Sequence, residues 1–163
     1  MKSLFKVEHP AKFAGSRFPD LSAAFKAAGR GNARASVFRM AERLLVLEDN
    51  DQLATVYKEY LTERGYQVDC AVELEEAESL LSHFSYSLVI TDLRLSKLGF
   101  GGLDFIRRIR EVSSQIRIIV LTGYTWPEIE DEVLAHKVDA FLRKPIRLQE
   151  LAETIAMALG VAA

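Results

Sequence analysis

The sequence has few of the residues that build disulfide-linked, metal-cluster or membrane proteins. Of its 163 residues, one is cysteine (Cys70) and three are histidine, so an internal disulfide framework or cysteine metal cluster is excluded. The histidines, His9, His83 and His136, are scattered without the spacing of metal ligands. No apolar run approaches the roughly 20 residues that span a bilayer, and the basic N-terminus lacks the apolar core of a secretory signal. We therefore expect a cytoplasmic protein that does not bind membranes.

Charge is distributed unevenly along the chain. Residues 1–41 hold eight basic and two acidic residues, a net charge of +6, and the remainder holds 13 basic and 21 acidic residues, a net charge of −8. No helical or strand period is sustained across residues 1–40. We interpret residues 1–40 as a basic, mostly disordered extension and residues 41–160 as the folded domain. A nucleic-acid-binding arm is less favoured, because the basic residues are not concentrated on a folded face.

Two features leave the role of this extension open. Five phenylalanines argue against a plain solvated tail, since they could dock on the domain or on a partner; they are Phe5, Phe13, Phe18, Phe25 and Phe38. Alternatively, the functional unit could begin at Met40, which leads directly into the first predicted strand. The sequence pattern does not distinguish these alternatives.

Strand and helix patterns alternate five times in the rest of the chain. The predicted strands cover residues 44–48, 67–72, 87–91, 116–121 and 139–142. Amphipathic helical patterns follow each strand, and the one after the third strand predicts that Leu103, Ile106, Ile109 and Val112 are buried. Such alternation is typical of α/β proteins in which a doubly wound, five-stranded parallel sheet carries helices on both faces.

Four of these strands are followed by residues that can bind a metal or a phosphate. The first ends at Glu48-Asp49, the third leads to Asp92, the fourth to Thr122 and the fifth to Lys144. Ligands of open parallel sheets bind outside the carboxyl ends of the strands, so we expect these groups to lie together. Clustered carboxylates suit Mg²⁺, and a carboxylate can accept a phosphoryl group as an aspartyl phosphate. A lysine and a hydroxyl would then stabilise the phosphoryl oxygens.

The segments around these residues resemble the signature blocks of response regulator receiver domains from two-component signal transduction. The blocks are residues 48–50 (EDN), 91–95 (TDLRL), 121–123 (LTG) and 141–145 (FLRKP), and the resemblance extends over roughly residues 43–159. It implies a flavodoxin-like fold with strand order 2-1-3-4-5. It also implies a single-domain response regulator that signals by protein contact. Such a domain is not an enzyme in the usual sense, since it catalyses only its own phosphorylation and dephosphorylation.

The resemblance assigns a role to each residue of the expected site. Asp92 would be the phosphoacceptor, and Thr122 and Lys144 would contact the phosphoryl group. The Mg²⁺ ligands would be Asp49 directly, Glu48 through water, Asp92, and the backbone carbonyl of Arg94. No other cofactor is implied.

The resemblance also predicts a switch and its partners. Phe141 would rotate inward on phosphorylation, and the peptide bond before Pro145 would be cis. A histidine kinase or phosphotransfer protein would supply the phosphoryl group. The face formed by the helix near residue 127, strand 139–142 and the helix near residue 148 would then bind a downstream protein, or form a homodimer. The connection at residues 96–102 is longer than the family pattern and lacks its usual proline.

Other interpretations of the same residues remain. The acidic residues could simply cap helices, although Asn50 or Asp51 is placed to cap the first helix in any case. A receiver-like interaction module that is never phosphorylated is the main functional alternative. A hydrolase of small phosphate esters is disfavoured, because such enzymes generally need an acid two positions after the nucleophile, where this chain has Arg94.

Overall fold

The structure is a computed structural model of the chain, and it describes residues 41–95, 101–123 and 127–161. Its five strands form one parallel sheet in the order β2-β1-β3-β4-β5, so the predicted fold class and strand order are confirmed. The expectations for residues 1–40 and 96–100 lie outside the described residues. The strands are β1 (Arg43–Leu47), β2 (Gln67–Ala71), β3 (Leu88–Thr91), β4 (Arg117–Thr122) and β5 (Ala140–Arg143).

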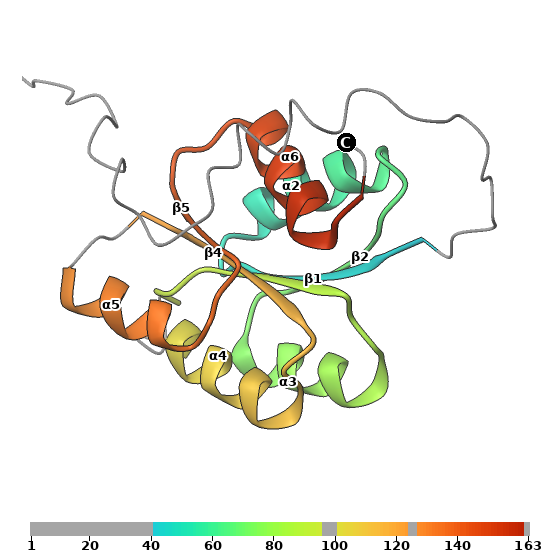
Figure 1. The fold of residues 1–163 in the computed structure, drawn as a ribbon. Coiled ribbons are helices and arrows are strands. Elements are labelled where there is room, and N and C mark those ends of the chain that lie inside the picture. The colour runs from blue at the N-terminus through green and yellow to red at the C-terminus, as the bar shows by residue number, and fades with distance from the viewer. Residues whose placement is uncertain (1–40, 96–100, 124–126, 162–163) are drawn as a thin grey trace, which may run out of the picture. The chain divides into compact units, whose positions relative to one another are not determined.

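Helices cover both faces of this sheet. They are α2 (Asp51–Thr62), α3 (Leu74–His83), α4 (Gly101–Val112), α5 (Pro127–Ala135) and α6 (Leu148–Leu159). Figure 1 shows α2 and α6 on one face and α3, α4 and α5 on the other. Side chains of a strand alternate between the faces, so Leu45 and Leu47 enter the core beneath α3 and α4 while Leu44 and Val46 enter the core beneath α2 and α6.

Local signals explain where several helices begin and end. The Asn50 side chain caps α2 by accepting a hydrogen bond from the Leu53 amide at 3.1 Å. Gly160 ends α6 with a φ of 65°, which a residue without Cβ adopts at little cost. The expectation for Val112 is wrong: this side chain is 82% exposed, because it belongs to the last residue of α4. Leu103, Ile106 and Ile109 are buried as predicted.

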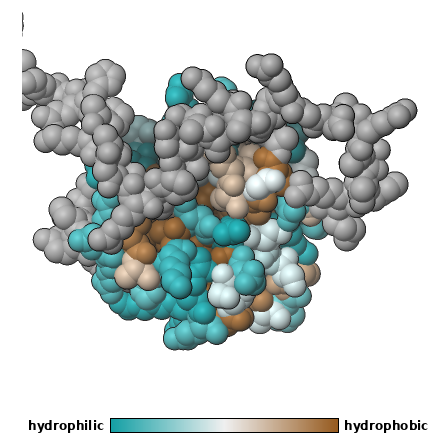
Figure 2. All heavy atoms as spheres, in the orientation of Figure 1, coloured by the Kyte–Doolittle hydropathy of each residue, from teal (hydrophilic) through white to brown (hydrophobic). Residues whose placement is uncertain are grey.

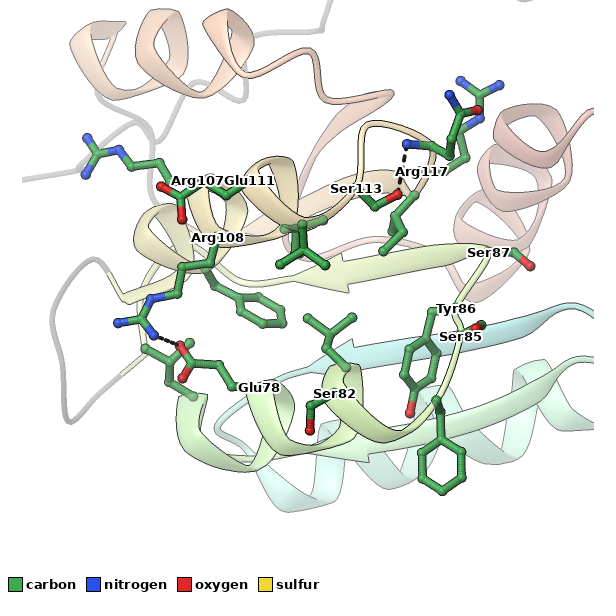
Figure 3. Close-up of a pocket in the computed structure, with 18 of the residues that line it drawn as sticks. Glu78, Ser82, Ser85, Tyr86, Ser87, Arg107, Arg108, Glu111, Ser113 and Arg117 are labelled. Carbon is green, nitrogen blue, oxygen red and sulfur yellow. Dashed lines mark hydrogen bonds and ion pairs between the residues drawn. The ribbon is translucent and has the colours of Figure 1, made fainter.

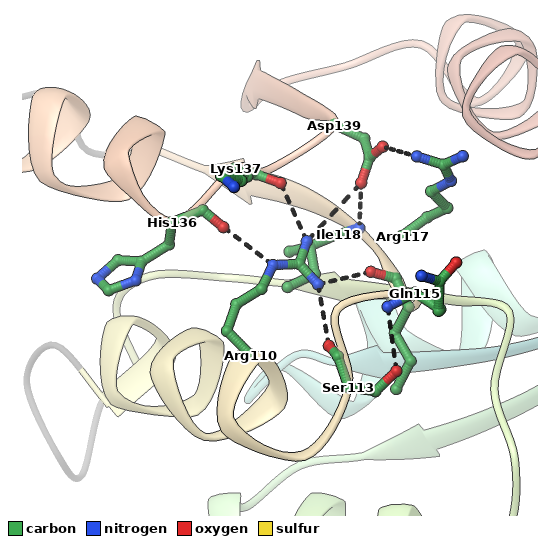
Figure 4. Close-up of polar contacts among 9 residues, drawn as sticks. Arg110, Ser113, Gln115, Arg117, Ile118, His136, Lys137 and Asp139 are labelled. Carbon is green, nitrogen blue, oxygen red and sulfur yellow. Dashed lines mark hydrogen bonds and ion pairs between the residues drawn. The ribbon is translucent and has the colours of Figure 1, made fainter.

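Arg110 of α4 holds the amino ends of β4 and β5 together. Its guanidinium group donates hydrogen bonds to the carbonyl oxygens of Ile116 at 2.7 Å, His136 at 2.9 Å and Lys137 at 3.0 Å (Figure 4). It also lies 4.0 Å from the Asp139 carboxylate. One side chain therefore links the end of α4 to the α5–β5 turn and to the start of β4.

The surface is mixed in polarity. In the space-filling view, hydrophilic residues cover much of the region of α4 and α5, with hydrophobic residues between them (Figure 2). Among the described helices, none is both long enough and apolar enough to cross a bilayer.

Candidate functional site

The parallel sheet brings two acidic residues to adjacent strand ends. β1 and β3 are neighbours, with Leu47 paired to Thr91, so the residues that follow each strand leave the sheet side by side. The Asp92 amide donates to the Leu47 carbonyl at 3.1 Å, and the Glu48 amide donates to the carbonyl of Ala71 in β2 at 3.1 Å. The backbone that carries both acids is therefore fixed by hydrogen bonds that extend the sheet.

Three carboxylates gather at this edge. One carboxylate oxygen from each of Glu48, Asp49 and Asp92 lies within 4.8 Å of the other two. Glu48 is 4% exposed and Asp92 is 8% exposed, while Asp49 is half-buried. Ionised carboxylates repel one another and lose hydration when they are buried, so this arrangement is costly without a positive charge.

Lys144 supplies a positive charge to the cluster. Its ammonium nitrogen donates to Glu48 Oε2 at 2.5 Å and to Asp92 Oδ2 at 2.6 Å. Its backbone amide donates to the carbonyl of Thr122, the buried last residue of β4, at 2.9 Å. The peptide bond from Lys144 to Pro145 is cis, as the family resemblance predicts. The structure therefore brings Glu48, Asp92 and Lys144 into direct contact and joins Lys144 to Thr122 through the backbone.

The pKa shifts follow from burial and from these contacts. Burial raises the pKa of Glu48 above its usual 4.5, the Lys144 ammonium opposes this shift, and the nearby Asp92 charge adds to it. Burial alone would lower the pKa of Lys144, but its hydrogen bonds to Asp92 and Glu48 and their charges outweigh that effect, so the pKa rises above 10.5. Lys144 is thus held in its charged form.

Tyr57 of α2 is a neighbour of the site that the strand-end pattern does not include. Its side chain is buried, and burial is the main reason that its pKa is raised to about 12. The charges of Lys144, Glu48 and Asp92 also act on its phenol, in opposing directions. Tyr57 belongs to a helix and not to a strand end, so the pattern of strand-end residues gives no sign that its side chain lies near the acids.

The structure also describes two further residues of the expected site, Arg94 and Phe141. The Arg94 amide donates to Asp92 Oδ1 at 3.0 Å, while the role of its carbonyl as a metal ligand stays a prediction. Phe141 of β5 is half-buried against the core cluster beneath α3 and α4. Its role as a switch also stays a prediction.

The donor set fits a divalent cation that prefers oxygen ligands. Carboxylate oxygens are typical ligands of Mg²⁺ in proteins, where the ion is held by one or two carboxylates and retains several waters. Glu48 and Asp92 share the single ammonium group of Lys144, so a bound cation would offset negative charge that one ammonium cannot fully balance. Glu48, Asp49 and Asp92 are therefore the residues that could hold Mg²⁺.

A cavity lies elsewhere in the fold and lacks this chemistry. It has a volume of about 1270 Å³ and lies between α3 and α4 (Figure 3). Leu81, Phe105 and Ile109 contribute apolar surface, and Arg108 bridges it by an ion pair to Glu78 at 2.6 Å. Among the described residues that line it, none belongs to the carboxylate cluster. This cavity is therefore separate from the place where the carboxylates and Lys144 converge.

Comparison with known families agrees with the fold. Residues 44–156 match the family described as the response regulator receiver domain, and the chain belongs to this family. It therefore carries a receiver domain of the kind found in response regulators of two-component systems.

Two relatives from Salmonella typhimurium are similar in sequence. The chain is 32% identical over 111 residues to the transcriptional regulatory protein TctD of strain SL1344. It is 34% identical over 109 residues to the virulence transcriptional regulatory protein PhoP of strain 14028s. Each match covers 67% of this chain and 48% of the relative, so the chain spans about half the length of these relatives.

Solved structures of receiver domains share the fold. A CheY-like receiver domain protein from Methanospirillum hungatei superposes with a TM-score of 0.70 at 23% identity, covering 74% of this chain and 94% of that one. A receiver domain protein from Clostridium thermocellum gives a TM-score of 0.63 at 28% identity, covering 73% and 94%. At 23% identity, the similarity to the Methanospirillum hungatei protein supports the fold alone.

Proposed function

We propose that this receiver domain is a phosphorylation switch in which Asp92 accepts a phosphoryl group in a Mg²⁺-dependent reaction. The observation that carries the proposal is the contact of Lys144 with Asp92 at 2.6 Å inside a cluster of three carboxylates. A nucleophile, a fixed cation and a set of metal ligands are the parts that phosphoryl transfer needs. Bound Mg²⁺ would neutralise negative charge on the acids and on the phosphoryl oxygens.

The chain's own residues would act as follows. A carboxylate oxygen of Asp92 attacks the phosphorus of a phosphohistidine on a histidine kinase or phosphotransfer protein. The P–N bond breaks with its electron pair returning to the imidazole, and a P–O bond to Asp92 forms. Lys144 then pairs with a phosphoryl oxygen, and the Thr122 hydroxyl donates to another. Glu48, Asp49 and the Arg94 carbonyl would hold the metal.

The added charge would be read on a nearby surface. An aspartyl phosphate carries about two negative charges where the free carboxylate carries one, and this change can bias a pre-existing equilibrium between two conformations. Thr122 ends β4 and Phe141 lies in the adjacent β5, so a movement of Thr122 toward the phosphate would free space for Phe141 to turn inward. The α5, β5 and α6 face is then the surface that binds a downstream protein or a second copy of the chain.

The proposed folded unit is residues 41–160, with residues 1–40 as a basic extension. TctD and PhoP are named as transcriptional regulators, but this chain matches only about half of each. We propose that the output of this domain is protein contact through the α5, β5 and α6 face. A cytoplasmic location would suit such a domain.

A labelling experiment tests the site. Wild type incubated with phosphoramidate and Mg²⁺ should gain one phosphoryl group by intact-mass spectrometry, and hydroxylamine should remove it, since it cleaves acyl phosphates. Asp92→Asn should gain none, and EDTA should prevent the gain in wild type. Asp104→Asn is the matched control, because it removes an exposed acid of α4 that pairs with Arg107. Equal labelling of Asp92→Asn and wild type would refute the assignment of Asp92.

A binding experiment tests the output. Beryllofluoride mimics a phosphoryl group without a covalent bond, so it should change which proteins wild type retains from a cell extract. The same comparison with Asp92→Asn should show no change. If wild type is neither labelled nor altered by beryllofluoride, the protein is an interaction module that does not use phosphorylation.

A further inference from the structure

Gly102, in the first turn of α4, lies directly against the backbone of Asp92. A Cβ atom placed on Gly102 would stand 1.9 Å from the Asp92 carbonyl oxygen and 2.7 Å from the Cα of Leu93. Both are backbone atoms in a closely packed region, so they cannot turn aside as a flexible side chain could. Any other residue at position 102 would displace either residues 92–93 or the start of α4.

Backbone conformation does not explain this glycine. The φ of Gly102 lies outside the left-handed region, unlike that of Gly65 at 88° or Gly160 at 65°. Within a helix, alanine is intrinsically more favourable than glycine. The close approach to Asp92 is therefore the physical reason that position 102 has no side chain.

Hydrogen bonds connect the start of α4 to the carboxylate of Asp92. The Gly102 amide donates to the Leu93 carbonyl at 3.2 Å, and the Arg94 amide donates to Asp92 Oδ1 at 3.0 Å. The other carboxylate oxygen, Oδ2, lies 2.6 Å from the Lys144 ammonium nitrogen. The start of α4, the backbone of residues 92–94 and the Asp92 carboxylate thus form one connected unit.

We infer that Gly102 is a positioning residue for Asp92: its missing side chain lets α4 rest on the Asp92 backbone and hold the carboxylate against Lys144. This inference rests on the proposed role of Asp92 as phosphoacceptor. Gly102 touches no reacting atom, so it acts only through Asp92. Reaction rates are sensitive to such placement, since a displacement of 1 Å can cost roughly 100-fold.

The rate of phosphorylation per folded molecule tests the inference. For Gly102→Ala we expect a fall of roughly 10- to 100-fold with phosphoramidate and Mg²⁺. Ile109→Val is the matched control, because it loosens the buried face of the same helix without contact to Asp92, and its rate per folded molecule should equal that of wild type. If position 102 were an ordinary helix position, alanine would stabilise the protein and leave the rate unchanged, and that result would overturn the inference.

Two arrangements keep the test decisive if Gly102→Ala folds poorly or if the proposed function is wrong. An osmolyte such as trimethylamine N-oxide favours the folded state, and a rate per folded molecule equal to that of wild type under these conditions would refute positioning. A crystal structure of Gly102→Ala tests the geometry without any reaction. We expect Asp92 Oδ2 to lie farther from Lys144 Nζ, and retention of the 2.6 Å contact would refute the inference. Failure of wild type to be labelled would refute the proposed function separately.

Discussion

The two ends of the sheet use the same kinds of charged residue in opposite ways. Toward the amino ends, two acids lie among hydrogen-bond donors. Asp139 accepts from Arg117 at 3.0 Å and from the Ile118 amide at 2.8 Å. Asp69 likewise accepts from Arg43 at 2.6 Å and from the Tyr86 hydroxyl at 2.8 Å. At the carboxyl ends, three carboxylates converge and Lys144 contacts two of them.

The pKa shifts at the two ends differ in direction. Burial alone would raise the pKa of Asp69, but the hydrogen bonds from Arg43 and Tyr86 and the charge of Arg43 lower it below 3.8. The pKa of Glu48 is raised instead, because the effect of burial outweighs the lowering caused by the hydrogen bond and charge of Lys144. Folding therefore favours the charged form of Asp69 and disfavours that of Glu48. Charge that is unfavourable for folding is typical of a functional site, whereas the amino-end pairs serve stability.

The largest effect should come from removing the cation at the carboxyl ends. Lys144→Met keeps much of the side chain's length but removes its charge, so we expect the labelling rate to fall roughly 100-fold or more, as when a preorganised charge partner of a reacting group is lost. The labelling rate would be measured by quenching phosphoramidate reactions at several times and recording the intact mass of the protein. Lys58→Met on the exposed surface of α2 is the control for loss of one positive charge. Equal labelling rates for Lys144→Met and Lys58→Met would contradict a special role for the cation at the carboxyl ends of the sheet.

Removing the cation at the opposite end should change stability and leave the chemistry intact. Arg110→Ala deprives several carbonyl oxygens of their donor, and an unsatisfied buried acceptor costs about 1–3 kcal/mol. We expect the free energy of unfolding to fall by about 3 kcal/mol in urea titrations. The free energy of unfolding of Arg110→Lys should lie between those of wild type and Arg110→Ala, because an ammonium cannot reach all the carbonyls at once. A labelling rate per folded molecule that also fell would show that the ends are coupled.

A smaller loss of stability should follow from trimming one donor to Asp69. Tyr86→Phe removes the hydroxyl that donates to Asp69 at 2.8 Å and leaves the ring in place. We expect a loss of about 1 kcal/mol of unfolding free energy, the usual net value of one hydrogen bond. Tyr60→Phe serves as a control, since the Tyr60 ring lies under Arg64 on the surface. Similar losses in both variants would mean that the Asp69 contacts add nothing specific.

The smallest effect is a dependence of stability on acid pH. Because the folded-state pKa of Asp69 is below its usual 3.8, its contribution is complete above that pH and is lost as the pH falls toward the folded-state value. The stability difference between wild type and Asp69→Asn should therefore shrink as the pH is lowered below about 3.8 in denaturant titrations. A difference that stayed constant or grew in acid would contradict the assigned shift.

Much of the fold was predictable because burial periodicity is a local property. Alternation of strand and helix patterns identified the elements, and the order of the parallel sheet agrees with the structure. The prediction that Val112 is buried is wrong because the helical period continues to the last residue of a helix whether or not the core extends that far. The site residues were recognisable as strand-end groups, whereas the proximity of Tyr57 and the contact of Gly102 with Asp92 left no pattern in the sequence.

The amino-acid sequence by itself determined which residues follow each strand, and hence which acids, hydroxyl and amine stand at one edge of a parallel sheet. Only the tertiary structure decided which of them touch: Lys144 reaches Glu48 and Asp92 across 96 and 52 positions of chain. The reason is physical. Hydrophobic periodicity is set by neighbours three or four residues apart, but the distance between two side chains on separate strands depends on how every intervening element packs.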